Sequence, residues 1–141
     1  MNGDITEILR KKGFKVTPQR LAIYKILMEG HHHPTAEMIF EKLQSRYPTM
    51  SLATVYKTIE VFRTMGLVQF LNVGEDKARY DANMAPHVHA VCGMCGEIID
   101  IMGVDMMSMQ KQVIENSGYQ IEESQVYFHG KCPACIKKKA N

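Results

Sequence analysis

The spacing of apolar side chains predicts four helices in the first 66 residues. Thr17, Thr35 and Ser51 each precede a stretch in which apolar residues recur at steps of three and four, and such residues commonly cap helix N-termini. Pro18 follows Thr17 at the first helical position, where proline is well tolerated. The predicted helices cover residues 5–12, 18–29, 36–43 and 52–65, and glycines at positions 13, 30 and 66 end three of them.

After Gly66 the helical spacing gives way to short apolar runs. Residues 67–73 predict a strand, 74–77 a turn and 78–81 a partner strand. Helices followed by a two-stranded hairpin are typical of a winged helix-turn-helix. In that fold the helix that begins after Ser51 enters the major groove of DNA, and the hairpin forms the wing.

A second set of elements follows a polar, proline-bounded segment at 81–86, which we interpret as a hinge. Strands are predicted at 87–91, 97–102 and 119–129, with a helix at 106–117. The lysines at 137–139 predict a solvated, disordered tail. The expected fold class is therefore α+β: a winged-helix DNA-binding domain at 1–82, a small α/β domain that holds the candidate metal ligands at 87–136, and a basic tail at 137–141.

Composition narrows the class of protein. With 141 residues, of which 45% are hydrophobic, the chain is able to bury a core. It has no apolar run near the length of a membrane span and no N-terminal leader pattern, so we expect a cytoplasmic protein without a membrane partner. Residues 1–66 hold ten Lys or Arg against six Asp or Glu, which points weakly to a polyanion there, although on this number alone ordinary surface charge is the favoured explanation.

All four cysteines fall into two C-x-x-C pairs, Cys92/Cys95 and Cys132/Cys135. Each pair places two thiolates on one tight turn, and two such turns supply the four corners of the tetrahedron that Zn²⁺ prefers. The gap between the pairs is longer than in usual zinc ribbons, but two strands and a helix fit inside it. We expect one structural Zn²⁺ per chain; a redox dithiol or free thiols are the alternatives.

A second candidate site surrounds His87 and His89. Residues two apart on a strand point to the same face, so both imidazoles can reach one ion. Asp81 lies upstream, Asp100 lies on the strand after the first cysteine pair, and His33 precedes Pro34 between two predicted helices. Three imidazoles and two carboxylates suit Fe²⁺ or Mn²⁺ better than a structural zinc.

These motifs together resemble the ferric uptake regulator (Fur) family. The resemblance follows the chain in order through residues 13–20, 33–36, 51–57 and 87–96 and the pair Cys132/Cys135. It implies a winged-helix domain, a small dimerisation domain, a homodimer, and metal-dependent binding to a palindromic double-stranded DNA operator. The protein would be a transcriptional repressor and not an enzyme.

Within the family the chain looks most like the peroxide-sensing (PerR) branch. That resemblance implies one regulatory Fe²⁺ or Mn²⁺ per chain, and it implies oxidation of ligand histidines by peroxide, with His33 and His87 the sensitive ones. The implied ligands of this ion are His33, Asp81, His87, His89 and Asp100. A further metal site of many relatives is expected to be absent, because its ligand positions hold Pro86, Val88, Met107 and Ser124.

We expect the DNA contacts to lie around the fourth helix. Lys15, Arg20 and Lys57 are candidates for phosphate contact, and Thr54 and Tyr56 for contact with base edges. Ser51, at the start of the helix, completes the set. Simple packing beside the neighbouring valine is the alternative role of Tyr56.

Three other functions remain open from the sequence. The chain can be an iron-, manganese- or zinc-responsive repressor without peroxide chemistry, a mononuclear metalloenzyme, or a thiol redox protein. The operator sequence, the target genes, the physiological metal and the roles of His31 and His32 are not evident from the residues.

Overall fold

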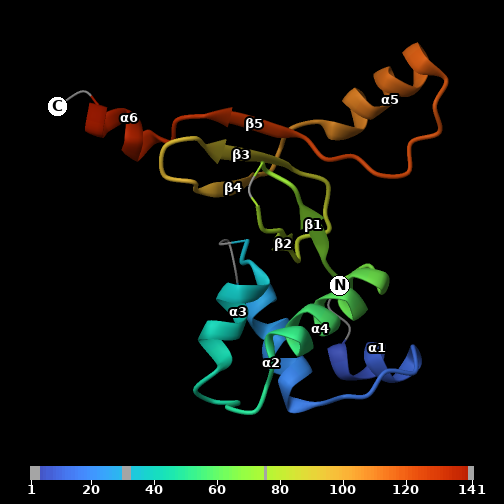
Figure 1. Ribbon diagram of the computed structural model, residues 1–141. Helices are drawn as coiled ribbons and strands as arrows, with labels where there is room; N and C mark the ends of the chain where they lie inside the picture. Colours follow the sequence, from blue (N-terminus) through green and yellow to red (C-terminus); the bar gives the residue numbers. More distant parts are fainter. Residues whose placement is uncertain (1–3, 30–32, 75, 140–141) are drawn as a thin grey trace. The chain divides into compact units, whose positions relative to one another are not determined.

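The computed structural model describes residues 4–29, 33–74 and 76–139, and within them the chain divides into two compact units, Met1–Met84 and Ala85–Asn141 (Figure 1). Helices and sheets occur in both units, which confirms the α+β class. No helix in these three ranges is long and apolar enough to cross a membrane.

The first unit begins with four helices, three of which start where the cap chemistry predicts. The side-chain oxygens of Thr17, Thr35 and Ser51 each accept a hydrogen bond from the backbone N–H three residues later. Gly30, His31 and His32 lie outside the described residues. The helices are α1 (Ile5–Lys11), α2 (Pro18–Met28), α3 (Ala36–Leu43) and α4 (Leu52–Thr64).

The core of this unit forms where the apolar faces of the helices meet. Phe62 of α4 is fully buried, and its ring packs edge-to-face with the Tyr24 ring of α2, with centroids 5.4 Å apart. Ile23, Ile39 and Val55 are also completely buried. Because α3 and α4 are packed together through this core, the exposed face of α4 is held on a fixed support.

The hairpin that follows α4 is shorter than predicted. Strands β1 (Gln69–Leu71) and β2 (Arg79–Asp81) pair antiparallel with Phe70 opposite Tyr80. The expected strand at 67–73 loses its start because Leu67 donates its N–H to the carbonyl of Phe62 and so closes the end of α4. Helices followed by this hairpin make the unit a winged helix-turn-helix. Glu75, which falls in the predicted turn at 74–77, lies outside the described residues.

The second unit is a three-stranded sheet with two helices. Its strands are β3 (Val88–Cys92), β4 (Ile98–Ile101) and β5 (Tyr127–Gly130). Strand β3 lies in the middle, antiparallel to β4 and parallel to β5. Helix α5 (Met106–Ser117) connects β4 to β5 and ends at Gly118 in the left-handed conformation. Helix α6 (Pro133–Lys139) follows β5.

Two sequence predictions were wrong in this unit. The strand predicted at 119–129 is confined to Tyr127–Gly130, because residues 119–126 are rich in polar, solvent-exposed side chains and find no long strand partner. The lysines at 137–139 belong to α6 and are not a disordered tail. Pro133 takes the first helical position, and Ile136 donates its N–H to the carbonyl of Cys132.

The register of the sheet separates two kinds of face. His89 stands opposite Asp100 on β4 and opposite Tyr127 on β5, so these three side chains share one face. The neighbouring Ala90 stands opposite Ile99 and Phe128, which therefore share the other face. One face thus carries His89 and Asp100, and the other face is apolar at Ala90, Ile99 and Phe128.

Candidate metal centres

Four cysteine sulfurs gather at one end of the sheet, as the two C-x-x-C pairs predict. Their ligand atoms all lie within 4.8 Å of one another. Cys92 ends β3, Cys95 lies in the turn after it, Cys132 precedes α6, and Cys135 lies in its first turn. The sulfurs of Cys95 and Cys132 are 3.8 Å apart. This spacing of four sulfurs suits a tetrahedral Zn²⁺.

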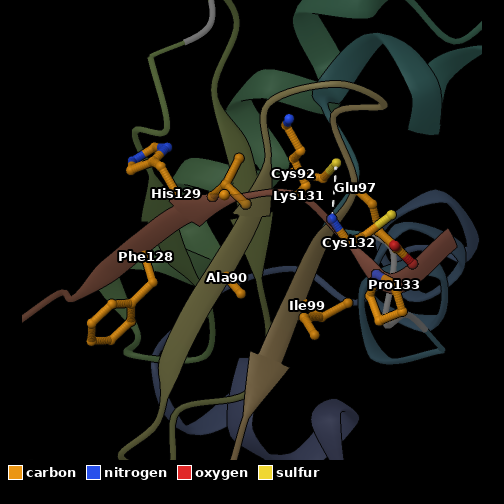
Figure 2. Close-up of a pocket in the computed structure, with 11 residues that line it drawn as sticks. Ala90, Cys92, Glu97, Ile99, Phe128, His129, Lys131, Cys132 and Pro133 are labelled. Atoms are coloured by element: carbon orange, nitrogen blue, oxygen red, sulfur yellow. Dashed lines mark hydrogen bonds between the residues drawn. The ribbon is translucent and has the colours of Figure 1, made fainter. Parts of the chain in front are cut away.

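Backbone N–H groups point at these sulfurs and favour the thiolate form of Cys92. The N–H of Cys132 donates to the sulfur of Cys92 at 3.3 Å, as Figure 2 shows, and hydrogen bonds from the backbone of Cys95 and then Cys132 lower the pKa of Cys92 to about 6. The pKa of Cys135 is raised to about 12, chiefly by its contact with the Cys132 thiol. Crowded thiols therefore retain protons that a zinc ion would displace.

A second group of candidate ligand atoms lies on the face of the sheet that carries His89 and Asp100. The Nε2 atoms of His87 and His89 are 3.0 Å apart. Oδ1 of Asp100 lies 3.4 Å from Nε2 of His87 and 3.2 Å from Nε2 of His89. Both histidines are buried. Two imidazole nitrogens and one carboxylate oxygen therefore converge within the second unit, as predicted.

The orientation of His87 suits a metal ligand. Its Nδ1 lies 2.5 Å from the carbonyl oxygen of Ala85, and a carbonyl only accepts hydrogen bonds, so Nδ1 carries the proton. That tautomer leaves the lone pair on Nε2, the atom that faces His89 and Asp100. The His89 ring stacks on the Tyr127 ring with centroids 5.5 Å apart, which limits rotation of the imidazole. Sequence reasoning missed both Ala85 and Tyr127.

The first unit contains the other two predicted ligands as a pair. Nε2 of His33 lies 3.6 Å from Oδ2 of Asp81, and both side chains are buried. The second carboxylate oxygen, Oδ1, accepts the N–H of Asn83 at 2.8 Å. Asp81 ends β2, and His33 lies just before α3, where Tyr80 of β2 donates its N–H to the Pro34 carbonyl. The wing thus holds the two residues together.

His33 is the described non-glycine residue with a positive φ, at 46°. A left-handed backbone at a non-glycine residue is uncommon and costs about 1–3 kcal/mol, and such residues concentrate at functional sites. Arg79 donates a hydrogen bond to the His33 carbonyl at 3.4 Å. The local structure therefore supports an unfavourable backbone conformation at a predicted ligand.

The donor chemistry of the histidine and aspartate groups fits a hard or borderline divalent ion. They offer imidazole nitrogen and carboxylate oxygen, without thiolate, and this mixture suits Fe²⁺ and Mn²⁺. The four cysteine sulfurs are soft donors, and together they fill all four coordination positions of a tetrahedral Zn²⁺. The two sets therefore differ in role: one is structural and the other is suited to an exchangeable ion.

The predicted DNA contacts lie in the first unit. Ser51 uses its side-chain oxygen to cap α4 at 3.1 Å from the N–H of Thr54, while Tyr56 and Lys57 are exposed on the next turn. The guanidinium of Arg20 donates to the backbone carbonyl of Lys15 at 2.8 Å, which places the Arg20 side chain against the backbone of Lys15. Sequence reasoning missed Glu37, whose carboxylate accepts a hydrogen bond from the Tyr56 hydroxyl.

Comparison with known proteins decides the family. The model of the ferric uptake regulator family matches residues 11–129. The chain belongs to the ferric uptake regulator family. This confirms the resemblance drawn from the five motifs, and it makes the chain a metal-responsive regulator with a structural zinc and a regulatory metal site.

Three relatives illustrate how this Fur-family chain compares. It is 35% identical over 133 residues to the peroxide operon regulator of Bacillus subtilis, covering 94% of this chain and 92% of that protein. The solved peroxide stress regulator of Campylobacter jejuni is 32% identical, with a TM-score of 0.75, covering 94% of this chain and 100% of that one. The solved Vibrio cholerae ferric uptake regulator is 30% identical, with a TM-score of 0.74, covering 92% and 100%.

Proposed function

We propose that this chain is a transcriptional repressor that binds palindromic operator DNA as a homodimer and senses hydrogen peroxide through Fe²⁺-catalysed oxidation of ligand histidines. The convergence of His87, His89 and Asp100 on one face of the sheet is the observation that carries the proposal. The relatives in Bacillus subtilis and Campylobacter jejuni, which are named as peroxide regulators, support the choice of signal.

We assign one regulatory Fe²⁺ or Mn²⁺ to five ligands. His33 and Asp81 come from the first unit, and His87, His89 and Asp100 come from the second. An ion held by both units restricts their relative motion, so fewer arrangements compete with the one that fits the operator. The metal favours DNA binding by its higher affinity for that arrangement.

The first unit supplies the DNA-binding surface. Helix α4 would enter the major groove, with Thr54 and Tyr56 near base edges and Lys57 near phosphate. Ser51 caps the N-terminus of this helix, where backbone N–H groups and the helix dipole favour a phosphate. The Arg20 side chain lies against the backbone of Lys15, and both residues would contact the backbone of the DNA.

The second unit supplies the dimer surface. Helix α5 has no buried residue, and it stands clear of the sheet in Figure 1. Its exposed apolar side chains include Met107 and Val113. Ile99 and Phe128 are exposed on the apolar face of the sheet, where a pocket of about 230 Å³ opens next to the zinc cluster (Figure 2). Exposed apolar surface of this extent is typical of a protein interface, and a second copy of the chain is the partner we propose.

The chemical step we propose is the transfer of one oxygen atom from peroxide to an imidazole. Bound Fe²⁺ supplies the redox chemistry that activates the O–O bond. In the net reaction a ring carbon of His33 or His87 gains the oxygen, peroxide is reduced by two electrons, the imidazole is oxidised by two, and one water leaves. Since His87 lies within hydrogen-bond distance of His89 and close to Asp100, its oxidation removes a ligand from the cluster and weakens metal retention.

Peptide mass spectrometry tests this step. The Fe²⁺-loaded chain is treated with one equivalent of peroxide, and the Mn²⁺-loaded chain is the control. We expect one added oxygen on the peptide that holds His33 or His87 in the iron form alone. An iron form whose histidine peptides are unmodified while DNA binding still requires metal would instead make the chain a metal sensor without peroxide chemistry.

A further inference from the structure

The first unit contains a polar contact that the proposed repression and sensing steps do not use. Tyr56, in the second turn of α4, donates its hydroxyl proton to Oε1 of Glu37, in the first turn of α3. The two residues are 19 positions apart in the chain. The contact therefore depends on the packing of α3 against α4. Tyr56 is 42% exposed, so its ring still faces solvent.

Glu37 is held in place as a charged acceptor. Its helix begins at the Thr35 cap, and Ile39 and Leu43 anchor the same helix in the core. Oε2 of the carboxylate is buried. The hydrogen bond from Tyr56 lowers the pKa of Glu37, and its position in the first turn of a helix also favours negative charge. The carboxylate is therefore ionised at neutral pH and accepts hydrogen bonds without donating any.

Tyr56 in turn keeps its proton and commits it to Glu37. The hydrogen bond to the carboxylate raises the pKa of Tyr56 to about 12, so the phenol is neutral at physiological pH. A phenol has a single O–H donor. Once that donor is used inside the protein, a base beside the hydroxyl meets only its acceptor lone pairs.

We propose that Glu37 is a positioning residue for sequence recognition: it makes Tyr56 an acceptor only, so that the base nearest the Tyr56 hydroxyl, on one strand, is selected for an amino donor in the major groove. The donors available there are N6 of adenine and N4 of cytosine, whereas O6 of guanine and O4 of thymine only accept. Without Glu37 the hydroxyl is able to donate to either acceptor, and the preference weakens. This inference rests on the proposed function, because α4 must lie in the groove.

The charge of Glu37 supports a role in selectivity over one in affinity. A carboxylate close to the exposed face of α4 repels phosphates, so it lowers the affinity for every DNA sequence. Selectivity is the difference between the affinities for the correct and the incorrect DNA sequences. A group that weakens binding to every sequence still increases selectivity if it weakens binding to the incorrect sequences more. Glu37 has this effect because the Tyr56 hydroxyl oxygen and O6 of guanine or O4 of thymine are then both acceptors, so no hydrogen bond forms between them.

Selection from a randomised duplex DNA pool by the full-length, Mn²⁺-loaded protein tests the proposal. The wild type is compared with E37A, E37D, Y56F and the E37A/Y56F double variant. E37D retains the charge but is one methylene too short for the same contact. E41A is the matched control, because it removes one exposed carboxylate from the same helix. Thermal unfolding checks that each variant is folded. If E37A does not fold, E37D replaces it as the variant that tests the loss of the contact. Affinities are then measured at one salt concentration on duplexes that differ at one symmetric base pair.

We expect E37A and E37D to lose about five- to tenfold of the discrimination at one position in each half-site, the worth of one hydrogen bond to a base edge. Y56F should lose preference at that same position, and the double variant should lose no more than Y56F alone, while E41A keeps the wild-type preference. The inference is overturned if E37A and E37D keep that preference, if they change the affinity for all duplexes by one common factor, or if Y56F reads every position as the wild type does. If the wild type selects no sequence, the proposed function itself fails.

Discussion

Loss of zinc should unfold the second unit and leave the first intact. In the described part of the second unit the buried aliphatic side chains are Val88, Val91 and Ile98. At about 1.5–3 kcal/mol for each buried side chain, they contribute about 5–9 kcal/mol. A structural zinc contributes about 10–16 kcal/mol of binding energy that is also folding energy. The metal is therefore the larger stabilising term, whereas the first unit has an apolar core of its own.

The perturbation is C95S, with M94A as its control. Cys95 and Met94 lie in the same exposed turn, but only Cys95 belongs to the sulfur cluster. We expect hydrogen exchange to show lost amide protection in β3, β4 and β5 of C95S and retained protection in α2 and α4. M94A should match the wild type. Full protection of the three strands in C95S, or after removal of zinc by a strong chelator, would show that the small aliphatic core suffices and that our reasoning is wrong.

Three further predictions concern separate parts of the molecule. F62A should destabilise the first unit by about 3–5 kcal/mol in urea unfolding, because Phe62 is fully buried against Tyr24. T35A should remove the cap of α3 and cost about 1 kcal/mol of the same unfolding free energy; an unchanged midpoint would mean that the cap is dispensable. Zinc affinity, measured by chelator competition, should rise with pH, because the pKa of Cys135 is raised to about 12 and its proton must leave when zinc binds. Below a pH of about 6 Cys92 is protonated as well, so the zinc affinity should fall more steeply there. A zinc affinity independent of pH would contradict this assignment of protons.

The parts of the fold that were predictable from sequence depend on local chemistry. The caps at Thr17, Thr35 and Ser51 are confirmed because a hydroxyl needs only the backbone three residues later. The cluster of four sulfurs was equally predictable, because each C-x-x-C pair places two sulfurs on one tight turn. The strand predicted at 119–129 was wrong because a strand also requires a partner, and spacing alone does not show whether one is within reach.

The features that escaped prediction are contacts between distant parts of the sequence. The hydrogen bond from Tyr56 to Glu37 exists only because α3 and α4 pack together. The carbonyl of Ala85, which sets the tautomer of His87, is a backbone atom and has no residue-type signature. The pairing of His33 with Asp81 needs the wing to lie against the start of α3. Residue identity therefore indicated the candidate ligands, and the fold determines what orients their side chains.

The central claim is that peroxide releases this repressor from DNA through its regulatory metal. The most direct test is the affinity of the Fe²⁺-loaded protein for a duplex selected from a random pool, before and after one equivalent of peroxide, with the Mn²⁺-loaded protein measured in parallel. We expect the iron form to lose at least about tenfold in affinity, since removal of a ligand favours the arrangements that do not fit DNA, and the manganese form to be unchanged. Equal behaviour of the two forms, whether both keep or both lose affinity, would contradict the claim.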